Sequence, residues 1–118
     1  MSIIRPGTTT PILTAASSPA PSPSGATTAH QLARANTVRA YITYNGTVNA
    51  CAIRLWLYDG ANWYEGPSTD DLDPLTPGGA SPVNESRDWE IGEGQKFTFQ
   101  LESISGGGTA AVSAEGAV

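Results

Sequence analysis

The sequence is poor in the residues that most often build catalytic and metal sites. Its 118 residues include one cysteine, Cys51, and one histidine, His30. A single cysteine forms no disulfide within the chain, and one isolated histidine is a weak start for a metal site. No nucleophile, phosphate-binding or metal-ligand motif is present. We therefore expect no enzymatic activity, no metal and no cofactor, and we expect Cys51 to be a small buried hydrophobic residue.

Long apolar stretches are also missing. No run of 18 apolar residues occurs, and the first 21 residues lack the continuous apolar segment of a signal peptide. The sequence thus predicts no contact with a membrane and synthesis in the cytoplasm.

Charge is scarce and unevenly placed. Charged residues make up 14% of the chain, and all eleven acidic residues follow residue 58. Residues 1–40 carry three arginines and no acid, whereas the remainder has a net charge of −8. An acidic body without a cluster of lysine and arginine argues against nucleic-acid binding and favours a protein partner.

Residues 37–65 carry the clearest strand pattern. Cys51, Ile53, Leu55 and Leu57 alternate with a second face that holds Arg54 and two aromatic residues. Asn45-Gly46 predicts a tight hairpin, and residues 59–62 predict another. A three-stranded antiparallel meander is therefore expected here.

A second amphipathic strand is predicted near the end of the chain. Phe97, Phe99 and Leu101 share one face of residues 95–104, and three consecutive glycines then lead into residues 109–118. We expect the last segment to pair with residues 97–103. Two such apolar faces favour an all-β fold, a small antiparallel β-sandwich of jelly-roll-like form covering residues 37–118. Residues 66–88 are expected to be a loop, in which a solvated acidic cluster is favoured over a calcium site.

The first 36 residues read differently from the rest. They are rich in Pro, Ser, Thr and Ala and predict an extended N-terminal arm, which cannot order itself and is expected to dock on another chain. Removal of residues 1–30 should then leave a folded sandwich. The expected partner-binding anchors of the arm are Ile3, Ile4, Arg5, Ile12 and Leu13.

Four aromatic residues of the central stretch are candidates for an interface. Trp56 and Tyr58 lie on the non-core face of their strand, and Trp63 and Tyr64 follow the turn. Exposed aromatic pairs favour self-association, for which we expect a homotrimer. The alternative is that Trp56, Trp63, Tyr64 and Trp89 form a carbohydrate-binding platform.

The whole pattern resembles a known group of proteins. An N-terminal arm, the segment RLWLYDGANWYE, the segment GEGQKFTFQLESISGG and a small-residue C-terminal strand are similar to the small β-sandwich virion proteins of tailed bacteriophages, especially capsid decoration or cement proteins. The resemblance implies a structural protein, made in the host cytoplasm, that lies on the outer capsid surface. It implies a trimer that clamps neighbouring subunits of the major capsid protein. A tail or fibre connector of the same virion class and a carbohydrate-binding module remain as alternatives.

Overall fold

The structure is a computed structural model that describes residues 2–25, 28–78 and 83–118. This part of the chain contains strands and no helix, as the sequence predicted, and none of its elements is a helix long and apolar enough to cross a membrane. The strands are β1 (Ser2–Ile4), β2 (Thr10–Ala16), β3 (His30–Leu32), β4 (Thr37–Asn45), β5 (Ala50–Tyr58), β6 (Trp63–Ser68), β7 (Val83–Glu90), β8 (Lys96–Ser105) and β9 (Thr109–Ala117).

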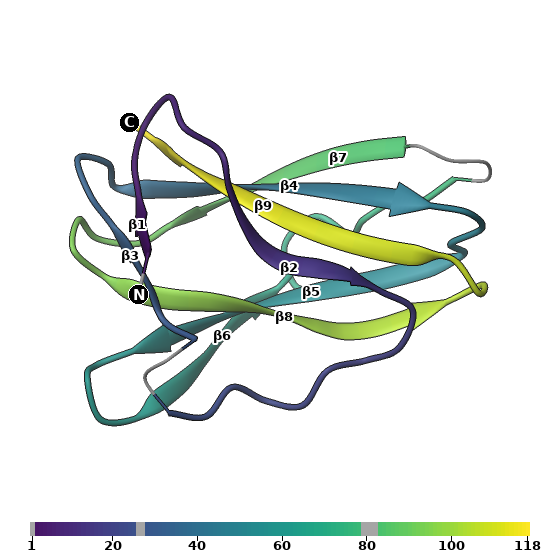
Figure 1. Cartoon of the computed structure of the whole chain (residues 1–118), viewed down its shortest axis with the longest axis horizontal. Coiled ribbons are helices and arrows are strands. Elements are labelled where there is room, and N and C mark those ends of the chain that lie inside the picture. Colours follow the sequence, from purple (N-terminus) through teal and green to yellow (C-terminus); the bar gives the residue numbers. More distant parts are fainter. Residues whose placement is uncertain (1, 26–27, 79–82) are drawn as a thin grey trace.

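Two sheets pack face to face (Figure 1). One has the order β1-β3-β8-β5-β6 and the other β2-β9-β4-β7. Strand pairs are antiparallel, with the exception of β1 and β3. Strands β2–β9 alone give two four-stranded sheets between which the chain repeatedly crosses, which is the jelly-roll arrangement. The expected antiparallel, jelly-roll-like sandwich is confirmed.

The core forms where the alternating apolar faces of the two sheets meet. Strand β4 directs Val38, Ala40, Ile42 and Tyr44 inward, each at most 1% exposed, and β9 adds Val112. The apolar faces of β5 and β8 were expected to oppose each other, but these strands are neighbours in one sheet. The opposing layer comes from β4 and β9, whose small and branched residues allow the two sheets to approach.

Two of the predicted strand connections are wrong. Asn45-Gly46 does not close a hairpin, because β4 pairs with β7 and β9 while β5 pairs with β6 and β8. The last strand pairs with β4 and β2, not with β8. The turn between β4 and β5 and the turn between β8 and β9 each cross from one sheet to the other. These two turns contact each other, since the Gly108 N–H donates to the Thr47 carbonyl over 2.8 Å. The hairpin between β5 and β6 is confirmed.

The expected loop at residues 66–88 is shorter than predicted, because β6 runs to Ser68 and β7 begins at Val83. Strand β7 lacked an apolar alternation that would reveal it. Glu85 and Arg87 take its inward positions, where Glu85 accepts hydrogen bonds from Thr76 and Arg87 donates to the Asp73 carbonyl. Polar side chains can occupy this edge because the adjoining loop supplies their partners.

The N-terminal residues are built into the body, so the expectation of an extended arm held by another chain is corrected. Strand β1 pairs with β3 at the edge of one sheet, and β2 pairs with β9 at the edge of the other. Figure 1 shows both purple strands lying against the sandwich. Residues on both sides of the expected boundary at residue 36 therefore contribute to both sheets. Strand edges offer unpaired backbone groups, which can order a segment of low apolar content.

Candidate functional site

The five residues expected to anchor an arm do not form one surface. Ile4 is fully buried in the core, so its side chain is unavailable to a partner. Ile3 is half-buried and Arg5 is exposed. Ile12 and Leu13 on β2 are half-buried and pack against the core. Only this last pair borders a hollow that a ligand can enter, as described below.

The aromatic residues of the β5–β6 hairpin are less exposed than predicted. The Tyr58 ring packs on Trp63 with centroids 4.6 Å apart, and Tyr58 is 8% exposed. Trp56 is half-buried and donates its indole N–H to Gln100 over 2.7 Å. Tyr64 is the exposed member, at 53%. The exposed Trp56 and Tyr58 pair that favoured a trimer is therefore absent.

The proline-rich linker, of which residues 17–25 and 28–29 are described, contacts the sheet that contains β8. The Ala20 N–H donates to the Leu101 carbonyl over 2.9 Å, and the Gln100 amide donates to the Ala20 carbonyl over 2.9 Å. Further along, the Trp63 indole donates to the Gly25 carbonyl over 3.0 Å. The body of the same chain thus supplies the surface that was expected from a partner.

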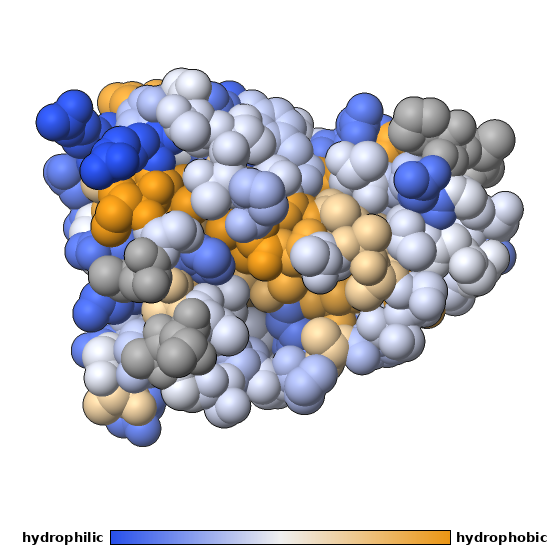
Figure 2. Space-filling model, in the orientation of Figure 1, coloured by the Kyte–Doolittle hydropathy of each residue, from blue (hydrophilic) through white to orange (hydrophobic). Residues whose placement is uncertain are grey.

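A groove lies between this linker, β2 and β8. Its volume is about 500 Å³, which is within the usual range of ligand pockets. Figure 2 shows apolar surface running across this face of the molecule. Apolar residues form much of the wall, and none of the described residues that line it is Asp, Glu, Lys or Arg. The lining residues are Ile12, Leu13, Ala20, Pro21, Ser22, Pro23, Ser24, Thr28, His30, Thr98, Phe99 and Gln100.

The edge of β8 is open at one residue inside this groove. Phe97 is paired with His30 of β3, and the Leu101 carbonyl accepts from Ala20. Alternate residues of an antiparallel strand direct their N–H and C=O groups to the same side, so Phe99 directs its groups there as well. Within the described ranges no residue is paired with Phe99 on that side. Among the described residues, the Phe99 backbone is therefore an unpaired position between two paired ones.

His30 keeps the groove uncharged near neutral pH. Burial is the main cause that lowers the pKa of this imidazole below its usual value. The Ser2 hydroxyl is hydrogen-bonded to Nδ1, and the ring lies 6.0 Å from that of Phe97. His30 is thus a half-buried residue of the groove wall.

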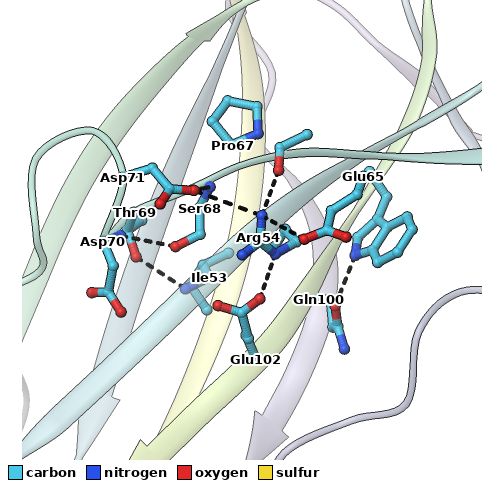
Figure 3. Close-up of polar contacts among 12 residues, drawn as sticks. Ile53, Arg54, Glu65, Pro67, Ser68, Thr69, Asp70, Asp71, Gln100 and Glu102 are labelled. Atoms are coloured by element: carbon cyan, nitrogen blue, oxygen red, sulfur yellow. Dashed lines mark hydrogen bonds and ion pairs between the residues drawn. The ribbon is translucent and has the colours of Figure 1, made fainter.

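A network centred on Arg54 stabilises the outer face of the β5 sheet (Figure 3). The guanidinium is paired with Glu102 of β8 and, over 3.1 Å, with Glu65 of β6. It also donates to the Gly66 carbonyl over 2.7 Å and lies 3.7 Å from Asp71. The hydrogen bond with Glu102 is the main cause that raises the pKa of Arg54. The network joins three strands to the following loop and has a structural role.

The loop that follows β6 is held by hydrogen bonds within the chain. The Asp71 carboxylate accepts from the Ser68 N–H over 3.0 Å, and the Asp70 backbone N–H donates to the Ser68 hydroxyl oxygen over 2.9 Å. The Thr69 N–H donates to the Ile53 carbonyl over 2.8 Å, which fixes the loop to β5. In residues 2–25, 28–78 and 83–118, no three His, Cys, Asp or Glu side chains gather to hold a metal ion.

Cys51 is a core residue, as expected. It is 5% exposed, and burial raises the pKa of its thiol to about 11. A thiol in this state is a poor nucleophile at neutral pH.

A second, shallower hollow of about 390 Å³ adjoins Tyr64. Its wall includes Asp59, Gln95 and Lys96. Asp59 accepts from the Ala61 and Asn62 N–H groups and from the Tyr64 hydroxyl, with the Asn62 bond the main cause that lowers its pKa. An exposed ring beside polar groups is the arrangement that sugar-binding sites use, although here the carboxylate is already occupied.

No protein-family model, characterised protein or solved structure shows significant similarity to this chain.

The groove was not predicted, although several of its residues were noted. Phe99 was assigned to a strand and Ile12 and Leu13 were expected to bind a partner. Their placement around one hollow depends on Ala20 meeting Leu101, a contact between segments 81 residues apart that no local pattern encodes.

Proposed function

We propose that this protein is a structural, non-enzymatic virion protein that decorates and stabilises a bacteriophage capsid by binding neighbouring subunits of the major capsid protein. The observation that supports this best is the groove, in which an apolar wall and an open backbone position at Phe99 are suited to a segment of another protein. Strand addition of this kind is a common way for one chain to hold another.

The rigidity of the body agrees with a reinforcing role. Arg39 forms two hydrogen bonds with Asp88, of 2.8 and 3.0 Å, and ties two strands together. In the described part of the chain every buried side-chain nitrogen and oxygen has a hydrogen-bond partner. These contacts hold the polar side chains of the body in defined positions, as a reinforcing role requires.

We also propose that the protein is a homotrimer on the outer capsid surface, and both of these statements rest on the resemblance alone. The exposed pair of Trp56 and Tyr58, which had favoured a trimer, is covered in the structure. The jelly roll itself is used by both viral capsid and lectin domains, so the fold does not choose between the proposals.

Carbohydrate binding is the second candidate, on the strength of the exposed Tyr64 ring above its hollow. Carbohydrate binding would be supported if the protein binds to a polysaccharide column, the Tyr64→Ala variant does not bind, and the Tyr41→Phe variant still binds. Tyr41 is a suitable control because it lies on the opposite sheet, where its hydroxyl donates to Glu115.

The test of the first proposal uses virions of the phage that encodes the chain. Gradient-purified particles should contain the protein in fixed proportion to the major capsid protein. Particles stripped of it should lose resistance to heat and osmotic shock, and added purified protein should restore that resistance. Absence of the chain from purified particles would refute the virion role.

A further inference from the structure

The groove has a chemical preference that follows from its open backbone position. Phe99 offers one N–H and one C=O, flanked by the occupied positions at Phe97 and Leu101. A buried backbone group without a partner costs free energy, and a polypeptide in extended conformation satisfies both groups at once. A β-strand residue is therefore the natural complement.

The walls specify what side chains such a strand carries. Ile12, Leu13 and Phe99 supply apolar surface on the side of the body, and Pro21 and Pro23 supply it on the side of the linker. Among the described residues, this wall contains no Asp, Glu, Lys or Arg, and its one histidine, His30, is half-buried. A charged side chain would therefore lose its hydration without gaining a strong ion partner. The groove thus favours an uncharged segment with a bulky apolar residue.

We propose that this groove binds a short, extended, uncharged segment of a partner protein, which forms backbone hydrogen bonds with Phe99 and buries one apolar side chain against Ile12 and Leu13. The inference rests on the proposed function for the identity of the partner, the major capsid protein, and on the geometry for the chemistry of the segment.

A second copy of the chain is a poorer occupant. Its exposed large apolar side chains include Leu72, which is 51% exposed. Leu72 lies between Asp71 and Asp73 in sequence, and these carboxylates do not suit an uncharged groove. Tyr64 is followed in sequence by Glu65, whose carboxylate is paired with Arg54 and likewise does not suit an uncharged groove.

The first measurement needs no ligand. Amide hydrogen exchange, followed residue by residue by NMR, should be faster at Phe99 than at Thr98 and Gln100, because the alternation of the strand directs the N–H groups of these two residues toward β5. Equal protection of the three amides would mean that the position is occupied, and the proposal would fail.

The second measurement uses an array of capped heptapeptides made of uncharged residues with a central Leu, Ile, Val or Phe. The best binder should protect the Phe99 amide. N-methylation of its central peptide nitrogen should weaken binding about tenfold, because one backbone hydrogen bond is lost. Equal binding of the methylated peptide, or no binding by any member at millimolar concentration, would overturn the proposal. If a small apolar alcohol displaces the peptide and methylation of the peptide does not change its affinity, the groove would be assigned to a small molecule instead.

A matched pair of variants locates the binding. Ser22 lines the groove and is exposed, so Ser22→Trp places a large ring at its mouth without disturbing the core. Ser18 is exposed in the same linker outside the groove, and Ser18→Trp is the control. The first should abolish peptide binding and the second should not. If Ser22→Trp still attaches to particles and protects them, the groove proposal fails while the virion role stands. If the chain binds peptide but is absent from virions, the virion role fails while the groove proposal stands.

Discussion

Strand β1 gives the sharpest test of the fold, because the sequence suggests a dissociable arm and the structure places Ile4 in the core. Ile4 has no exposed surface, and its neighbour Leu32 is equally buried. The Ile4 carbonyl accepts a hydrogen bond from the Ala33 N–H over 2.9 Å. The perturbation is Ile4→Ala.

The expected magnitude follows from the burial. Three methyl or methylene groups are removed from the core, at about 0.8 kcal/mol each, which gives about 2.4 kcal/mol. The cavity left behind adds to this, and buried Ile→Ala substitutions cost about 2–5 kcal/mol in all. For a domain of 118 residues that corresponds to a fall in Tm of about 8–20 °C.

The assay is urea unfolding at pH 7, followed by tryptophan fluorescence and by circular dichroism to check that the two transitions coincide. Ile3→Ala is the control, since Ile3 is next in sequence but half-buried and outside the core cluster. It should lose less than half as much. A loss below about 0.5 kcal/mol for Ile4→Ala, a value typical of surface sites, would show that the Ile4 side chain does not stay in the core and would contradict the place of β1 in the sheet.

Two further predictions concern the polar groups. Arg54→Met nearly keeps the length of the side chain but leaves Glu65 and Glu102 without their cation, and should lower the free energy of unfolding by about 1–3 kcal/mol, measured by urea unfolding. The double variant Arg54→Met/Glu102→Gln should regain part of this loss. If it regains none, the pairing of Arg54 with Glu102 is contradicted. Burial, the largest single effect, would raise the pKa of Glu85, but hydrogen bonds from Thr76 and Tyr44 and the charge of Arg87 together outweigh it and hold that pKa below its usual value of 4.5. A carboxyl with a lowered folded pKa stabilises the protein above its unfolded pKa and loses that contribution as the pH falls through its folded value. The stability difference between wild type and Glu85→Gln should therefore be large at pH 7 and shrink below about pH 4.5; a constant difference across this range would contradict it.

The fold class could be predicted because it depends on local patterns. The alternation in β5 and β8 marks strands with one buried face, and Asp59-Gly60 marks the hairpin after Tyr58. The sheet partners could not be predicted in the same way. Asn45-Gly46 is a strong local signal for a hairpin, yet β4 and β5 both have a buried face that needs an opposing layer, and placing them in different sheets buries both.

The N-terminal strands and the groove were beyond local reasoning for a related reason. Composition predicted that residues 1–36 cannot form a packed unit alone. It did not show that the edges of the body were free to order them. Likewise Trp56 and Tyr58 were correctly assigned to the outer face of β5, but what covers them comes from Trp63 and from neighbouring polar residues such as Gln100.

The position of the N-terminal strands changes how attachment to a partner can be tested. An arm that only fastens the protein could be deleted, and a chain lacking residues 1–30 would still fold. In the structure that deletion removes β1, β2 and His30, the first residue of β3, uncovers the edge of β9 and takes Ile4 out of the core. We therefore expect the truncated chain to be insoluble or much less stable, so that its failure to bind would carry no information about binding. A change at the mouth of the groove alters the contact surface and leaves both sheets whole, and only that kind of variant separates recognition of a partner from the stability of the fold.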